Sequence, residues 1–181
     1  DHNAILSKMG DVTVVFEVQL PELFTMSNDE YEAFHHVLIK AIKVLPVNSV
    51  LHKQDWFTEA KYKPSFIQED NSFLTRSSDR FFNERSYLDH RCYIMLTKKP
   101  ANRKSGSSIF SSLLRRTIVP EETLKPKHFY DFMNHVGQFQ KILLDSGFIS
   151  MKQIQNNELA DFVLQYLNLG NDSTVIRDIE F

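Results

Sequence analysis

Three side chains near the middle of the sequence have the types needed for nucleophilic catalysis. Asp89, His90 and Cys92 lie within four residues of one another, and a cysteine with a histidine and an aspartate is a known nucleophile, base and orienting set. On an extended segment, His90 and Cys92 would share a face. Cys92, however, is followed directly by the apolar run 93–96, which favours a buried cysteine. A small hydrolase is therefore our third hypothesis, and we assign no catalytic residue.

Histidines are the other candidates for chemistry, because imidazole is a common metal ligand. His35 and His36 are adjacent, so on a helix they point about 100° apart. His128 and His135 are seven residues apart on one helical face, too distant to share a tetrahedral metal without a third element. We therefore predict no metal site. The seven histidines are His2, His35, His36, His52, His90, His128 and His135.

Nucleotide chemistry has no support in the sequence. The five glycines are at positions 10, 106, 137, 147 and 170, and no GxxxxGK[ST] loop is present to hold phosphates. The segment 104–108 is the nearest approach, but it lacks the first glycine and the Gly-Lys pair. GxSxG and HExxH motifs are also absent. We predict no cofactor in this chain.

A polar tract with the single tryptophan is the first candidate for partner binding. If the tract is a strand, alternation places His52, Gln54 and Trp56 on one face and Lys53, Asp55 and Phe57 on the other. A nuclease would need a further carboxylate pair nearby, and none is apparent. We expect Trp56 to pack on a polar sheet face or on a partner surface. The candidate residues are His52, Gln54, Asp55 and Trp56.

A basic segment is the second candidate for partner binding. Lys98, Lys99, Arg103 and Lys104 are followed by Arg115 and Arg116, with no acidic residue from 98 to 120. Such a segment can meet phosphate, whether of DNA or of anionic lipid headgroups. The alternative is a solvated, flexible loop over 98–112, since Ser, Asn, Gly and Pro accompany the cations.

The elements that must position these residues follow from local patterns. Alternation predicts a hairpin over 4–20 and strands over 48–57 and 90–97. Ser27 and Glu30 have the spacing of a capping box, so a helix is expected to start there and to stop before Pro46. Further helices are expected over 70–84, 127–146 and 157–169, with a short extended piece at 148–151 and a last strand over 173–181.

These elements give the order β-β-α-β-α-β-α-α-β. Because the first connection is a tight hairpin, a purely parallel sheet is not expected. The sequence predicts an α+β fold with a mixed, mainly antiparallel sheet and helices packed on one face.

Composition limits the class of protein. The chain has 181 residues, a net charge of -2 and 42% hydrophobic residues, which is ordinary for one globular domain and excludes disorder. No apolar run approaches the ~18 residues of a membrane span. A single cysteine cannot form an internal disulfide. The chain begins with Asp1 rather than Met, so we expect residues 1–181 to be one domain excised from a longer protein.

Several stretches of sequence, which follow one another over about the first hundred residues, resemble the N-terminal region of TraG proteins of Bacteroides-type conjugative transposons. They are Gly10-Asp11-Val12-Thr13, Leu20-Pro21-Glu22-Leu23-Phe24-Thr25-Met26-Ser27, Lys40-Ala41-Ile42-Lys43-Val44-Leu45-Pro46, His52-Lys53-Gln54-Asp55-Trp56-Phe57, Phe82-Asn83-Glu84-Arg85, Leu88-Asp89-His90 and Leu96-Thr97-Lys98. The remainder of the chain is compatible but less distinctive.

The resemblance implies a function without chemistry of its own. This group is similar to the VirB-type ATPases of type IV secretion, in which a non-catalytic N-terminal domain precedes an ATPase domain with the Walker motifs. Only the former matches, so ATP and Mg²⁺ are expected for the missing domain. The expected partners are other secretion subunits, the ATPase domain and further copies of the chain. The expected location is the cytoplasmic face of the inner membrane.

Two hypotheses for the function of the candidate surface follow. The first is a docking and assembly domain that uses the tract at 52–56 and the basic segment. The alternative is a nucleic-acid-binding module that contacts transferred DNA through Lys98, Lys99, Arg103 and Lys104.

Overall fold

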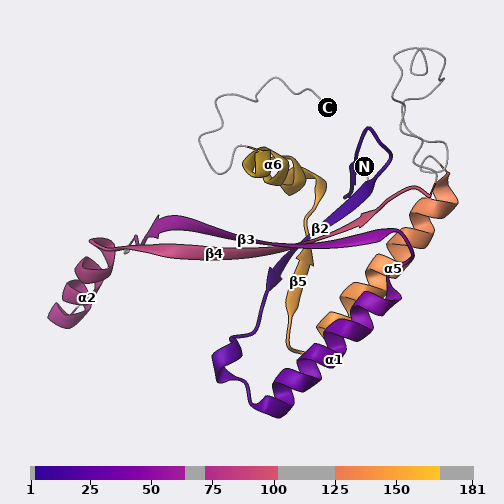
Figure 1. Ribbon diagram of the computed structural model, residues 1–181. Helices are drawn as coiled ribbons and strands as arrows, with labels where there is room; N and C mark the ends of the chain where they lie inside the picture. The colour runs from indigo at the N-terminus through magenta and orange to yellow at the C-terminus, as the bar shows by residue number, and fades with distance from the viewer. Residues whose placement is uncertain (1–2, 64–71, 102–124, 168–181) are drawn as a thin grey trace. The chain divides into compact units, whose positions relative to one another are not determined.

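The computed structural model describes residues 3–63, 72–101 and 125–167 (Figure 1). The chain forms two compact units. The first comprises Asp1–Gln54 and Cys92–Phe181, and the second is Asp55–Arg91. The expectation of a single domain for 1–181 stays a prediction. The elements are β1 (Ile5–Leu6), β2 (Val12–Gln19), a short 3-10 turn (Leu23–Thr25), α1 (Asn28–Val44), β3 (Ser49–Lys61), α2 (Phe73–Asn83), β4 (Ser86–Lys98), α5 (Pro126–Asp145), β5 (Ser150–Gln153) and α6 (Asn156–Leu167).

Strand β2 is the centre of an antiparallel sheet. It pairs with β4 along its whole apolar stretch, from Val12 opposite Lys98 to Val18 opposite Cys92. Its other edge is shared by two short strands, with β1 at the start and β5 at the end. The order along the sheet is β1-β2-β4-β3, with β5 joined to β2. The expected α+β class with a mainly antiparallel sheet is confirmed, and β5 is a strand that the predicted order lacked.

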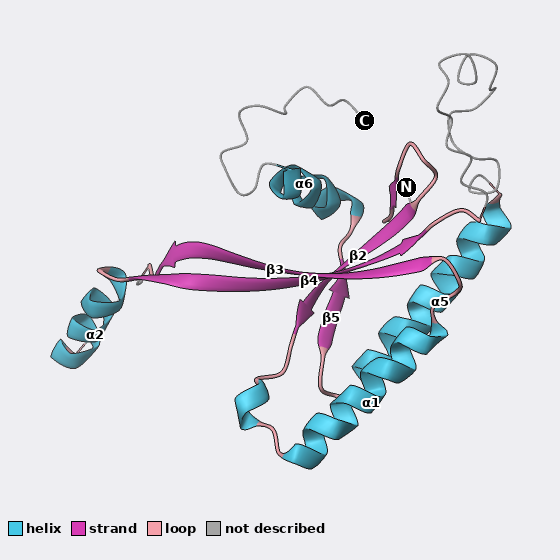
Figure 2. Cartoon of the chain, in the orientation of Figure 1, coloured by secondary structure: helices cyan, strands magenta, loops and turns pink. Residues whose placement is uncertain are grey.

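The main core lies between one face of this sheet and the helix pair α1 and α5 (Figure 2). Alternation places Val14, Phe16 and Val18 on that face, and each is buried. Helix α5 presents a stripe at spacings of four, three and four, the pattern of a helix with one buried face. The stripe consists of Phe132, Val136, Phe139 and Leu143. Ala41 of α1 is fully buried, and its small side chain lets the backbone of α1 approach the core.

The opposite face of the sheet is covered as well. Val15 and Tyr93, which point away from the α5 side, are 0% and 5% exposed. The ring of Tyr93 lies 4.9 Å from that of Phe162 in α6, and Figure 2 shows α6 on the side of the sheet away from α1 and α5. The expectation that the helices pack on one face therefore holds for α1 and α5 but not for α6.

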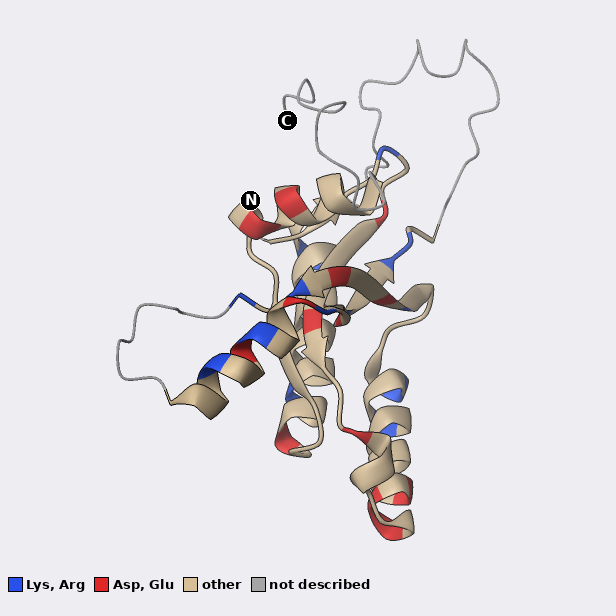
Figure 3. Ribbon diagram, turned by 90° about the vertical axis from the view of Figure 1, so that its left-hand side faces the viewer, with Lys and Arg blue, Asp and Glu red and all other residues tan. Residues whose placement is uncertain are grey.

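Helix α1 begins where the capping box predicts. The Ser27 hydroxyl accepts from the Glu30 amide at 3.3 Å, and the Glu30 carboxylate accepts from the Ser27 amide at 2.8 Å. Acidic side chains lie in its first turn and Lys43 in its last, as the helix dipole favours. Figure 3 colours the acidic residues red and the basic residues blue along the ribbon. These hydrogen bonds lower the pKa of Glu30, the larger effect coming from the Ser27 backbone amide.

Loss of this cap is expected to weaken α1. Ser27→Ala should lower the free energy of unfolding by about 1 kcal/mol, measured by urea denaturation at pH 7. Because the folded pKa of Glu30 is lowered from 4.5, the stabilisation by its carboxylate is complete above pH 4.5 and is lost as pH falls through the folded pKa. The difference between wild type and Glu30→Gln should therefore shrink below pH 4.5. A difference that does not change with pH would contradict the reciprocal cap.

The other predicted elements agree closely with the described ones. Helix α2 begins three residues later than expected, α5 begins one residue earlier and α6 begins one residue earlier. Strands β3 and β4 are each longer than expected, extending to Lys61 and starting at Ser86. The last expected strand, 173–181, lies outside the described residues. Within the described chain, no helix is long and apolar enough to cross a membrane.

Candidate functional site

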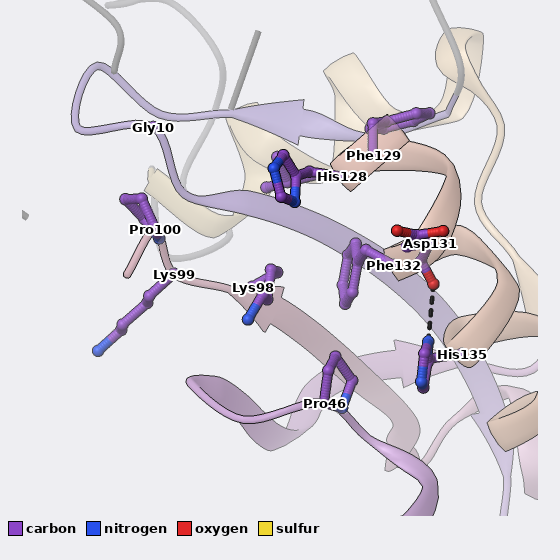
Figure 4. Close-up of a pocket in the computed structure, with 11 residues that line it drawn as sticks. Gly10, Pro46, Lys98, Lys99, Pro100, His128, Phe129, Asp131, Phe132 and His135 are labelled. Carbon is purple, nitrogen blue, oxygen red and sulfur yellow. Dashed lines mark hydrogen bonds between the residues drawn. The ribbon is translucent and has the colours of Figure 1, made fainter. Parts of the chain in front are cut away.

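A pocket of about 220 Å³ lies in the first unit, at the start of α5 (Figure 4). The turn before β2 supplies Gly10, the link from α1 to β3 supplies Pro46, and the end of β4 supplies two lysines. Four segments distant in sequence therefore meet at this place. The lining residues are Gly10, Val12, Pro46, Lys98, Lys99, Pro100, His128, Phe129, Asp131, Phe132 and His135.

The two lysines of the pocket were both partner-binding candidates. Lys98 ends β4, and its ammonium group donates to the Val47 carbonyl oxygen. The amide of Lys99 donates to the Asn48 carbonyl oxygen at 3.0 Å. Both side chains are half-buried. These contacts hold the end of β4 against the link between α1 and β3, and the first of them fixes the positive charge of Lys98 there.

His128 and His135 face the same pocket from α5. The Nδ1 atom of His135 lies 2.7 Å from the backbone carbonyl oxygen of Asp131. A carbonyl oxygen only accepts, so Nδ1 carries a proton and Nε2 is the nitrogen left for a ligand. Among the described residues, no three His, Cys, Asp or Glu side chains come together as a metal site would require.

The tract around Trp56 is divided between the two units. His52 is exposed and Gln54 half-buried in the first unit, while Asp55 and Trp56 begin the second. None of the four lines the pocket of Lys98 and Lys99. The remaining candidates, Arg103 and Lys104, lie outside the described residues, as does most of the expected loop at 98–112.

Within the second unit, Asp55 and Phe57 share a face, as alternation predicted. The Nε2 atom of His90 lies 2.9 Å from the Asp55 carboxylate, and the His90 ring stacks on Phe57 with ring centres 4.7 Å apart. The carboxylate partner of His90 is therefore Asp55 and not Asp89. The Asp89 carboxylate instead lies 3.5 Å from the Nε atom of Arg91. Cys92 is 3% exposed and belongs to the core of the first unit.

The second unit differs from the first in having no core of its own. None of its described residues is buried, and large apolar side chains are exposed on α2 and on both strand segments. Phe73 and Leu74 are the most exposed, at 82% and 77%. The exposed set is Phe57, Tyr62, Phe73, Leu74, Phe81, Phe82, Tyr87 and Leu88. A surface of this kind is typical of a binding interface.

The orientation of α2 explains this exposure. Its polar side meets the end of β3, because Asn83 donates to the Tyr62 carbonyl oxygen at 2.8 Å and the Tyr62 hydroxyl donates to Asp79 at 3.4 Å. One aromatic edge contact, Tyr62 with Phe82, accompanies these hydrogen bonds. At about 100° per residue, the three exposed apolar residues of α2 together lie on the side of the helix opposite to the polar residues Asp79 and Asn83. These apolar residues are Phe73, Leu74 and Phe81. The apolar side of α2 is consequently left uncovered within its unit.

Comparison with known families gives one partial match. Residues 1–36 are similar to a family described as "Domain of unknown function, B. Theta Gene description (DUF3875)". The matched stretch covers β1, β2 and the first half of α1. No curated protein matches the chain.

The composition of the pocket was not predicted from the sequence. His128 and His135 were known to share a helical face, and Lys98 and Lys99 were known to be a basic pair, but about 30 residues separate the two sets. The sequence feature that could have linked the two sets is the apolar pattern of β4 and α5. Both elements contribute side chains to the same core, and the end of β4 and the start of α5 both line the pocket.

Proposed function

We propose that this chain is the non-catalytic N-terminal docking and assembly domain of a conjugative DNA-transfer ATPase of the type IV secretion class. The observation that carries the docking role is the second unit, whose apolar side chains are exposed and whose described residues include none that is buried. A two-stranded ribbon with one short helix is marginal in water on its own. A partner that covers α2 would supply the apolar burial that the unit lacks.

The conjugation role rests on the resemblance of the first hundred residues to TraG-type N-terminal regions. The stretch that matches the family of unknown function lies inside this part of the chain, and the description of that family names no activity. The expected partners are subunits encoded by the same conjugative element and the ATPase domain of the same chain. ATP and Mg²⁺ would be bound by that ATPase domain, and the location would be the cytoplasmic face of the inner membrane.

Introduction of negative charge on the apolar side of α2 tests the docking surface. We expect Phe73→Asp with Leu74→Asp to weaken binding to the cognate transfer subunit more than tenfold, because two exposed apolar anchors are replaced by charges that must be desolvated. The measurement is pairwise binding, by interferometry, of the purified chain to each transfer subunit of its own element. Trp56→Ala is measured in parallel, since Trp56 is half-buried in the same unit.

Phe24→Asp is the matched control. Phe24 is 87% exposed but belongs to the first unit, so its replacement should leave binding unchanged. Failure of every transfer subunit to bind the wild-type chain, or equal binding by the α2 variant, would overturn the docking proposal. Measurable ATP turnover by the isolated chain would also count against it.

The alternative of nucleic-acid binding makes a different prediction. Of its four cations only Lys98 and Lys99 lie in the described chain. Binding to single-stranded DNA that falls steeply with salt and is lost on Lys-to-Glu replacement at 98, 99 and 104 and Arg103→Glu would favour this alternative.

A further inference from the structure

We infer that the pocket at the start of α5 binds a small phosphate monoester with an apolar body. This site is separate from the exposed surface of α2 and does not depend on the docking role. The inference stands on three features of the lining residues: their charge, the type of their cations and the apolar walls.

The charge of the lining favours an anion. The lining holds two lysines, Lys98 and Lys99, against a single carboxylate, that of Asp131. The Lys98 ammonium group keeps two N–H donors beyond the one that it gives to the Val47 carbonyl oxygen. Within the described chain no side chain caps the start of α5, and its first turn holds no acidic residue. The positive end of the helix dipole therefore adds to the potential of the lysines.

The type of cation favours phosphate over carboxylate. Planar carboxylates are best matched by the paired donors of arginine, whereas lysine binds as a compact point charge and is a common phosphate ligand. Two lysines and no arginine are among the described lining residues. Two lysines also balance the double negative charge that a phosphate monoester carries near neutral pH.

The walls favour an organic ester over the bare ion. Val12, Phe129 and Phe132 are apolar members of the lining. Pro46 and Pro100 lie near the lysines (Figure 4). Phe132 and Val12 are 2% and 8% exposed, so these walls are parts of the packed core and not mobile side chains. A volume of about 220 Å³ is below the range of drug-sized pockets, which limits the apolar body to roughly one ring.

Phenyl phosphate is the probe that combines both parts. We expect its addition to the ¹⁵N-labelled chain to shift the amide signals of residues 98–99 and 128–135 in a saturable way. Inorganic phosphate lacks the ring and benzyl alcohol lacks the charge, so each should bind at least tenfold more weakly. Benzoate, with a planar single charge, should also bind more weakly than phenyl phosphate.

Substitutions in the lining give changes of opposite sign. Lys99→Ala should weaken phenyl phosphate binding about tenfold or more, since a charged hydrogen bond is lost, and Lys99→Arg should retain part of it. Asp131→Asn should strengthen binding about two- to threefold, because one negative charge is removed from the lining. Lys141→Ala, an exposed lysine on the same helix, is the matched control and should change nothing.

Three results would overturn the inference. One is the absence of saturable shifts at the pocket with phenyl phosphate. Another is equal binding of benzoate or of inorganic phosphate, which would remove the phosphate or the apolar part of the argument. The third is an Asp131→Asn variant that is folded, as judged by signal dispersion, and binds phenyl phosphate more weakly than the wild type.

Discussion

Replacement of Phe16 by alanine is expected to lower the free energy of unfolding by about 3–5 kcal/mol. The side chain is 0% exposed and lies in the core cluster between the sheet and α5. Its strand pairs on both sides, with Ile94 opposite on β4 and Gln153 opposite on β5, so the backbone cannot easily collapse into the space left by the ring. The decrease in the free energy of unfolding should therefore be at the upper end of the range for replacing an aromatic residue with alanine.

The measurement is urea denaturation followed by far-ultraviolet circular dichroism. Fluorescence is less suitable because the single tryptophan, Trp56, belongs to the second unit and reports mainly on that unit. Phe24→Ala removes the same ring at a position that is 87% exposed and should change the free energy of unfolding by less than about 0.5 kcal/mol. Similar losses for the two variants would show that Phe16 does not lie in a packed core.

Replacement of Val15 by aspartate is expected to lower the free energy of unfolding by about as much as Phe16→Ala, for a different reason. Val15 is 0% exposed on the sheet face that α6 covers. A carboxylate placed there must either remain charged without water or take up a proton, and both states cost several kcal/mol. We expect a loss of about 3–5 kcal/mol, measured by the same denaturation experiment.

Gln19→Asp is the control for Val15→Asp. Gln19 lies on the same face of β2 by alternation but is exposed, so the introduced charge remains in water and the effect should be small. If Val15→Asp were tolerated as well as Gln19→Asp, the second face of the sheet would be open to solvent and α6 would not pack on it.

Features that depend on local sequence were predicted well. The capping box of Ser27 and Glu30 predicted the start of α1, and the apolar spacing from Phe132 to Leu143 predicted the buried face of α5. The residues that form each of these features are neighbours on one element. The local sequence pattern is therefore sufficient to predict them. Alternation placed Asp55 and Phe57 on one face of β3 for the same reason.

Features that depend on distant partners were predicted poorly. Val15 shares a face of β2 with the polar residues Thr13, Glu17 and Gln19, and this pattern predicts a face exposed to solvent. Val15 is nevertheless buried, because α6 covers that face. Residues 148–151 were predicted as a short extended piece without a partner strand, and β5 at 150–153 forms because β2 offers an unpaired edge. The amphipathic pattern of α2 predicted a helix with a buried side, but nothing local indicated that its own unit leaves that side uncovered.

The candidate site was predicted in part. Lys98 and Lys99 were chosen for their charge, yet the pocket that contains them depends on contacts between β4, the link before β3 and α5. His52, Gln54, Asp55 and Trp56 were chosen as one tract, but the division into units separates the first two from the last two. A strand pattern cannot reveal such a division, because it continues unchanged through the boundary.

The sharing of one edge of β2 by β1 and β5 has a consequence for synthesis of the chain on the ribosome. Strand β2 ends at Gln19, but half of one edge has no partner strand until residues 150–153 emerge. Its apolar face also waits for α5, which ends at Asp145. The nascent chain must therefore carry an unfinished sheet until α5 and β5 have been made, and final packing of this unit waits for their appearance.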